Sequence, residues 1–347
     1  DDTALDLQAL TITGDLVATG AGLTQSGALV VATGTSTLTV TTTDLLTLDN
    51  AANDFDTVLL SSGTGTVTLV DADDIDLGAS SVGGALNVTA TSGAITDSGA
   101  VDVTGAATFT AGTNVILDTA ANTFGSTVSF VGVGGPLGNV TIVDDTALDL
   151  QALTITGDLV AMGAGLVQSG ALSVGGTSTL TSTGSGNDIL LAGANDFGTS
   201  LLITTDATTG SDATLVDTTS VSLGTSSVGG LLEVTGPGID VTGNVSAGSL
   251  DLDASGGALT DTVGDLSVTG TATLTVTTTD VLTLDAVTND FGTVLLSSGT
   301  GAVTLVDADD IDLGASTLGG TLDVTATTSD ITDSGAVDVT SAATFTA

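Results

Sequence analysis

The side chains of this chain that could do chemistry are almost all carboxylates. The sequence holds 41 acidic residues, with Glu233 as the single glutamate, and no lysine, arginine, histidine or cysteine. Carboxylates bind hard cations such as calcium, and two neighbouring carboxylates can serve as a general acid and base. The densest group of acids, at 71–76 (DADDID), recurs unchanged at 307–312.

Calcium is the cation that these two acidic segments predict, because it prefers carboxylate and carbonyl oxygens. Both segments lack the glutamate and the spacing of an EF-hand loop, so aspartates that point into solvent are the simpler interpretation. Segment 184–190 resembles a calcium-binding β-roll repeat, but it occurs once and aligns with the ordinary segment 112–117. The candidate metal ligands are Asp71, Asp73, Asp74, Asp307, Asp309 and Asp310.

The composition argues against an enzyme. Polysaccharide-cleaving enzymes can use paired aspartates, and Asp73 with Asp74, or Asp144 with Asp145, would be the candidates. Enzymes of that kind bind acidic sugars through basic side chains, which are absent here. Serine-histidine and cysteine-histidine catalysis and histidine-based metal sites are excluded in the same way. We expect no catalytic residue and no required cofactor.

The charge of the chain restricts its partners. A formal net charge of −41 without a single base leaves nothing to neutralise phosphates, which excludes nucleic-acid binding and disfavours anionic membranes. No apolar run approaches the length of about 18 residues that a membrane helix needs. Cations are therefore the expected electrostatic partners, and membrane insertion is not expected.

Short strands are the elements that must carry these carboxylates. Val, Leu, Ile and Ala occur in short runs with Thr beside them, which is typical of strands. Asp76, Asp102 and Asp251 each lie between two apolar residues, the alternation of a strand with one buried face. Turns rich in Gly, Ser, Asp and Asn separate strand centres that recur about every eight residues.

Internal repeats decide how these strands are arranged. Residues 1–29 recur at 144–172, and residues 38–111 recur at 274–347. An Asn-x-Phe motif begins at Asn53, Asn122, Asn195 and Asn289, first at intervals near 70 residues. With about 23 residues per turn, one module of about 70 residues is three coils of a β-solenoid, and residues 1–347 form a single elongated array.

The same spacing assigns the phenylalanines to the core. Phe55, Phe124, Phe197 and Phe291 would lie three or more coils apart, too far to form one carbohydrate-stacking surface. We therefore predict that each phenylalanine fills the core beside a turn asparagine. Thr-x-Thr runs at 37–41 and 273–277 raise ice binding as a further alternative, but ice binding would require this pattern in every coil.

Segment 95–124 (ITDSGAVDVTGAATFTAGTNVILDTAANTF) and segment 66–90 (TVTLVDADDIDLGASSVGGALNVTA) resemble the repeats of very large bacterial surface proteins. These are the filamentous-haemagglutinin-like adhesins and the related β-strand-repeat proteins. The resemblance covers nearly the whole chain, and it implies a right-handed parallel β-helix that is exported and displayed at the cell surface. The absence of cysteine is compatible with export.

These observations predict a non-enzymatic structural subunit of an extracellular fibre or matrix, with coils that stack end to end. The alternative is the β-helical stalk of a bacterial surface adhesin. Residue 347 aligns with Ala111, after which the first copy continues directly into another strand. We therefore expect the chain to be a segment of a longer array or the subunit of a self-associating polymer.

Overall fold

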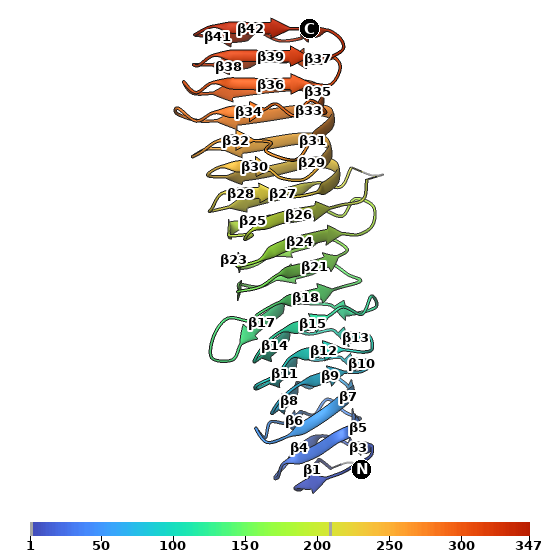
Figure 1. Ribbon diagram of the computed structural model, residues 1–347. Coiled ribbons are helices and arrows are strands. Elements are labelled where there is room, and N and C mark those ends of the chain that lie inside the picture. Colours follow the sequence, from blue (N-terminus) through green and yellow to red (C-terminus); the bar gives the residue numbers. More distant parts are fainter. Residues whose placement is uncertain (1–2, 208–209) are drawn as a thin grey trace. The chain divides into compact units, whose positions relative to one another are not determined.

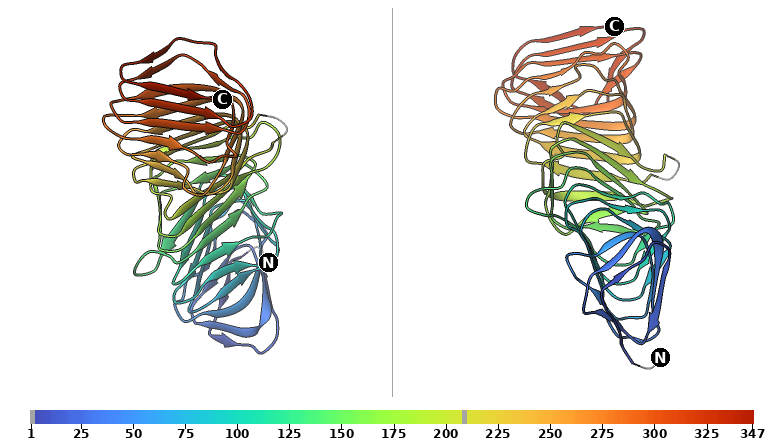
Figure 2. Two further views of the ribbon diagram at one scale, coloured as in Figure 1. Left: turned by 45° about the horizontal axis from the view of Figure 1, so that its top comes forward. Right: turned by 60° about the horizontal axis from the view of Figure 1, so that its bottom comes forward.

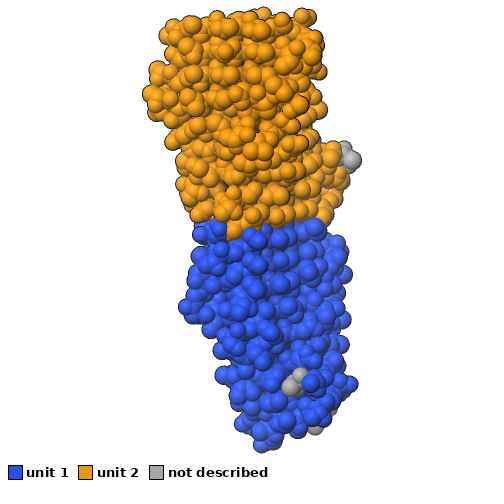
Figure 3. Space-filling view, viewed as in Figure 1, with its two compact units in different colours: residues 1–175 blue, residues 176–347 orange. Residues whose placement is uncertain are grey.

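Parallel strands stacked in ladders make up the computed structural model of the chain, which describes residues 3–207 and 210–347 (Figure 1). No helix occurs in those residues. The chain divides into two compact units, Asp1–Gly175 and Gly176–Ala347 (Figure 3). Each unit is a β-solenoid, so the predicted all-β parallel fold is confirmed.

The strands of unit 1 are short, and most have two to five residues. They are β1 Leu5–Leu7, β2 Leu10–Thr11, β3 Leu16–Gly20, β4 Leu23–Gln25, β5 Leu29–Val40, β6 Leu46–Leu48, β7 Asp54–Ser62, β8 Val67–Asp71, β9 Ile75–Leu77, β10 Ser80–Val82, β11 Leu86–Ala90, β12 Ile95–Asp97, β13 Val101–Val103, β14 Ala107–Ala111, β15 Val115–Leu117, β16 Thr123–Phe124, β17 Val128–Gly132, β18 Val140–Val143, β19 Leu148–Leu150, β20 Leu153–Ile155, β21 Leu159–Gly163, β22 Leu166–Gln168 and β23 Leu172–Val174.

Unit 2 contains several longer strands, which bend around a corner of the solenoid. Its strands are β24 Thr177–Ser182, β25 Ile189–Asn195, β26 Ser200–Thr204, β27 Ala213–Asp217, β28 Val221–Leu223, β29 Ser226–Gly236, β30 Ile239–Val241, β31 Val245–Ala254, β32 Leu259–Thr260, β33 Leu266–Val276, β34 Leu282–Leu284, β35 Asp290–Ser298, β36 Val303–Asp307, β37 Ile311–Leu313, β38 Ser316–Leu318, β39 Leu322–Ala326, β40 Ile331–Asp333, β41 Val337–Val339 and β42 Ala343–Thr346.

Strand register gives the length of one turn. In unit 1, Leu86 pairs with Val67 on one side and with Ala107 on the other, so these turns take 19 and 21 residues. Three ladder steps lead from Ser62 at the end of β7 through Val82 of β10 and Val103 of β13 to Phe124 of β16. The prediction of three coils per module is confirmed, and Figure 2 shows successive turns within a unit following a similar outline.

Alternation along each strand builds the core. In β8, Val67 and Leu69 are buried while Thr68 and Val70 are half-exposed, because successive side chains of a strand point to opposite faces. Equivalent residues of successive turns stack into apolar columns. Phe109 packs face to face on Phe130 of the next turn and edge-on against Phe124, with ring centroids 6.0 Å apart in both pairs.

Glycine is required where turns of neighbouring coils nearly touch. A Cβ atom at Gly65 would collide with the carbonyl oxygen of Asp44, and one at Gly301 would collide with that of Asp280. The repeated glycines in these turns therefore permit the close stacking of coils.

Candidate functional site

The structure separates the predicted calcium ligands into two kinds. Asp71 ends β8 and Asp307 ends β36, and both side chains are 0% exposed. The other four candidates, Asp73, Asp74, Asp309 and Asp310, lie in the following turns and are exposed. The interpretation of these segments as uniformly solvent-facing is therefore wrong for the first aspartate of each.

Backbone N–H groups donate hydrogen bonds to both buried carboxylates. The Phe55 N–H donates to Asp71 Oδ2 at 2.6 Å, and the Asp73 N–H donates to Asp71 Oδ1 at 2.9 Å. Asp307 accepts the same two bonds, from the Phe291 N–H at 2.8 Å and the Asp309 N–H at 2.9 Å. Each carboxylate thereby ties the end of one strand to the coil before it.

This arrangement accompanies all four Asn-x-Phe motifs. Asp144 Oδ1 accepts the Phe124 N–H at 3.2 Å, and Asp217 Oδ2 accepts the Phe197 N–H at 2.9 Å. We call each asparagine, phenylalanine and aspartate together an anchor. The four anchors are Asn53, Phe55 and Asp71; Asn122, Phe124 and Asp144; Asn195, Phe197 and Asp217; and Asn289, Phe291 and Asp307.

The anchor asparagines are also buried, each 0% exposed. Asn122 Oδ1 accepts the Val101 N–H at 2.8 Å, and its Nδ2 donates to Asp97 Oδ2 at 2.7 Å. Asn289 forms the same bridge, from the Leu266 N–H at 2.8 Å to Asp261 Oδ2 at 2.7 Å. In these two anchors the asparagine joins a backbone amide to a second buried acid, whereas Asn53 donates to Gln25 Oε1 at 3.0 Å.

The anchor phenylalanines lie in the core, each 1% exposed, as the sequence predicted. The buried aspartates were not predicted. A signal for them exists in the sequence, because the aspartate follows its phenylalanine by 16 residues in two anchors and by 20 in the other two. Aligning all four motifs over one further coil would have found it.

Burial alters the acidity of the anchor carboxyls. Loss of water around Asp71 raises its pKa to about 7, although the N–H groups of Asp73 and Phe55 oppose the shift. Burial likewise raises the pKa of Asp144, Asp261 and Asp307 above the ordinary value of 3.8. Near neutral pH the Asp71 carboxyl group therefore resists ionisation.

Half-exposed aspartates accept hydrogen bonds from hydroxyl groups of neighbouring coils. Asp76 accepts hydrogen bonds from Thr57, Thr96 and Ser98. Asp240 accepts hydrogen bonds from Thr260 and Thr262 at 2.8 Å each. Since the chain has no basic side chain, these bonds between coils take the place of salt bridges.

Calcium binding at 71–76 and 307–312 stays a prediction. The candidate ligands that remain exposed are Asp73 with Asp74 and Asp309 with Asp310. Within residues 3–207 and 210–347 no three acidic side chains are grouped so that they could hold a metal ion. Asp74 Oδ1 accepts the Ala94 N–H at 2.7 Å, and Asp310 Oδ1 accepts the Asp330 N–H at 2.9 Å. Asp310 has a lowered pKa, first because Ser329 donates a hydrogen bond to it.

Calcium held by Asp73 and Asp74 is expected to raise the melting temperature by a few degrees at millimolar concentration. The Asp73→Asn, Asp74→Asn double variant should lose this rise, as measured by differential scanning calorimetry. Magnesium at the same ionic strength is the control. Equal shifts with both cations, unaffected by the substitutions, would contradict a calcium site.

The remaining sequence candidates are not brought together into a site. Asp144 is buried and bonded to Thr146, whereas its proposed catalytic partner Asp145 is exposed. The Thr-x-Thr run of β33 faces different residues on the next coil, since Thr273 pairs with Leu295 and Thr275 with Ser297. The neighbouring coil therefore does not repeat the Thr-x-Thr pattern at this position, as ice binding would require.

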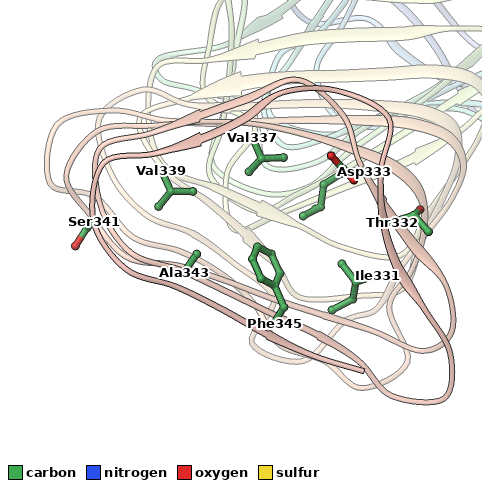
Figure 4. A pocket seen from close by; sticks show the side chains of 9 residues that line it. Ile331, Thr332, Asp333, Val337, Val339, Ser341, Ala343 and Phe345 are labelled. Carbon is green, nitrogen blue, oxygen red and sulfur yellow. The ribbon is translucent and has the colours of Figure 1, made fainter.

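An open recess of about 580 Å³ lies within the last turn of unit 2 (Figure 4). Apolar side chains of β40, β41 and β42 line it, among them Ile331, Val339 and Phe345, and Phe345 is 52% exposed. The repeat aligns these strands with β12, β13 and β14 of unit 1. The matching residues there, Ile95, Val101, Val103, Ala107 and Phe109, are at most 1% exposed.

Their burial in unit 1 comes from the next turn of the repeat. Val115 pairs with Ile95, Phe124 with Val103, and Phe130 with Phe109. A further coil of the same kind is therefore the structure that fits the recess.

Comparisons with known proteins give one match. A family model described as Repeats of unknown function (DUF5649) matches residues 1–62, 64–131, 137–204, 236–298 and 300–347. No curated protein and no solved structure matches the chain. No helix of the described residues is long and apolar enough to span a membrane.

Proposed function

We propose that this chain, which belongs to the family Repeats of unknown function, is a non-enzymatic structural subunit of an extracellular fibre or matrix. Its coils stack end to end, and its function lies in length and stiffness. The five family matches along the chain support this proposal, since they describe a repeated backbone unit. The anchors support it as well, because they fasten coils together.

The register of the coils is the observation that carries the proposal, because Val67, Leu86, Ala107 and Val128 stack at one position in four successive turns. The last turn shows what one more coil would cover, since Phe345 is 52% exposed whereas its counterpart Phe109 is 0% exposed beneath Phe130. Covering the exposed half of Phe345 contributes about 1 kcal/mol. In the proposed fibre, the next coil of the array supplies this contact and pairs with the outer edge of β42.

The resemblance of segment 95–124 to repeats of filamentous-haemagglutinin-like proteins supports placing the fibre outside the cell.

A charge placed in the recess tests end-to-end stacking. We expect the 347-residue chain to form concentration-dependent oligomers in sedimentation velocity, and Phe345→Asp to leave it monomeric. Burying an unpaired carboxylate in an apolar contact costs several kcal/mol, which corresponds to at least a hundred-fold weaker association.

Thr344→Asp is the matched control. It adds the same charge to the outward side of the same strand, in a column where Asp323 already stands one coil earlier. Oligomers should persist in this variant. If the unmodified chain stays monomeric at all concentrations, fibre assembly through this face is wrong, and the adhesin-stalk alternative becomes the better account.

A further inference from the structure

Three neighbouring strands of unit 1, β8, β11 and β14, have no charged side chain on their outward side. The outward residues of β8, β11 and β14 stand in two columns set by the ladder register. Each column holds only small hydroxyl, amide or β-branched side chains. We call these residues the uncharged strip: Thr68, Val70, Asn87, Thr89, Thr108 and Thr110.

The strip is unusual in a chain of net charge −41. Outward positions on other faces of the same turns carry acids, such as Asp76 on β9 and Asp102 on β13. Asp71, the acid next to Val70, is buried, and the exposed Asp73 and Asp74 lie in the turn after β8. In unit 2, the second copy of the repeat places the exposed Asp323 where unit 1 has Asn87.

The polar atoms of the strip are also free to bind. Within the described part of the chain, the hydroxyls of Thr68, Thr89 and Thr108 and the amide of Asn87 make no hydrogen bond to the protein. Asp76, one face away, is instead bonded by three hydroxyl groups from neighbouring coils. The strip therefore keeps unused donors and acceptors on the outward side of a regular parallel sheet.

We propose that the uncharged strip is a lateral contact between two copies of this chain, packed strip against strip. Faces that carry acids repel one another at contact, because no base is present to offset them. Only a face without charge lets two such chains approach closely. Small β-branched side chains on a parallel sheet suit this contact, because they interdigitate when two sheets pack about 10 Å apart.

The area of the strip determines whether one such contact can hold two single chains together. Three turns spaced by about 4.8 Å and two columns about 6.6 Å apart give a face of about 200 Å². A stable pair of proteins buries about 800 Å² per partner, so one strip cannot hold two single chains together. Lateral contact thus rests on the proposed function, because end-to-end stacking must first align many strips along one filament.

Asn87→Asp tests the proposal with little risk to folding, because the second copy carries Asp323 at that position between the same threonine neighbours. We expect filaments of the unmodified chain to bundle side by side in electron microscopy at physiological salt, where the Debye length is about 8 Å. In Asn87→Asp, single filaments should persist while the concentration for bundling rises about ten-fold or more.

Two further variants complete the test. Ala79→Asp adds the same charge in an exposed turn of another face and should leave bundling unchanged. Asp323→Asn makes the corresponding face of unit 2 uncharged and should promote bundling at lower concentration. Bundling that is unaffected by Asn87→Asp would overturn the proposal, as would filaments that stay single but bind a neutral polysaccharide through the strip. Loss of filaments in Phe345→Asp tests end stacking separately.

Discussion

Acidification from about pH 8 to about pH 5 is expected to raise the melting temperature of this protein by about 5 °C or more. Burial raises the pKa of Asp71 to about 7 from an ordinary value of 3.8. Between these values the folded chain holds a proton that the unfolded chain has released. Stability is therefore greatest at the acidic end of this window and falls as the pH rises toward 7.

The size of this effect follows from the shift. A displacement of about three pKa units corresponds to at most about 4 kcal/mol for one carboxyl group. The raised pKa values of Asp144, Asp261 and Asp307 act in the same direction. Repulsion among 41 acidic groups adds to the trend, because protonation removes it.

Asp71→Asn separates the anchor from general repulsion. The asparagine can still accept the Phe55 N–H, but it does not titrate, so the pH dependence of melting should become shallower. Asp338→Asn, at an exposed position of β41 in unit 2, is the control and should leave the pH dependence nearly unchanged. A melting temperature of the unmodified chain that falls steadily between about pH 7 and about pH 5 would contradict this account.

Asn289→Ala is expected to destabilise unit 2 by about 3 kcal/mol. The substitution leaves the buried Leu266 N–H without its acceptor at 2.8 Å, and it removes the Nδ2 donor from Asp261. A buried polar group that loses its partner lowers the free energy of unfolding by more than the hydrogen bond contributed, because water cannot reach the group and replace the partner.

Hydrogen exchange gives this prediction a local readout. The Leu266 amide should exchange slowly in the unmodified chain and much faster in Asn289→Ala, while amides of unit 1 stay protected. Asn244→Ala removes an exposed asparagine of the same unit and should shift stability by less than about 0.5 kcal/mol. Equal, small effects of both substitutions would show that the anchors contribute little.

The sequence predicted the fold well because its evidence is repeated. Alternation around Asp76, Asp102 and Asp251 indicated half-buried strands, and the Asn-x-Phe spacing indicated three coils per module. Solenoid contacts lie between neighbouring coils, so a period read from sequence translates directly into stacking. The same reasoning placed Phe55 and Phe291 in the core, where each is 1% exposed.

The buried aspartates escaped prediction because aspartate is ordinarily a surface residue. Nothing in the local pattern distinguishes Asp71, which ends a strand and bonds to the previous coil, from the exposed Asp73 two residues later. The difference arises only when coils stack and the Phe55 N–H meets the carboxylate. The uncharged strip depends likewise on register, which places Asn87 between Thr68 and Thr108.

Electron microscopy with fibre diffraction of the purified native material tests the structural proposal most directly. We predict long filaments with a strong reflection at about 4.8 Å along the filament axis, which would show coils stacked continuously from one copy to the next. Collecting the data with and without calcium also tests whether the exposed aspartates bind the ion. Discrete particles that never join, in either condition and at any concentration, would contradict the account.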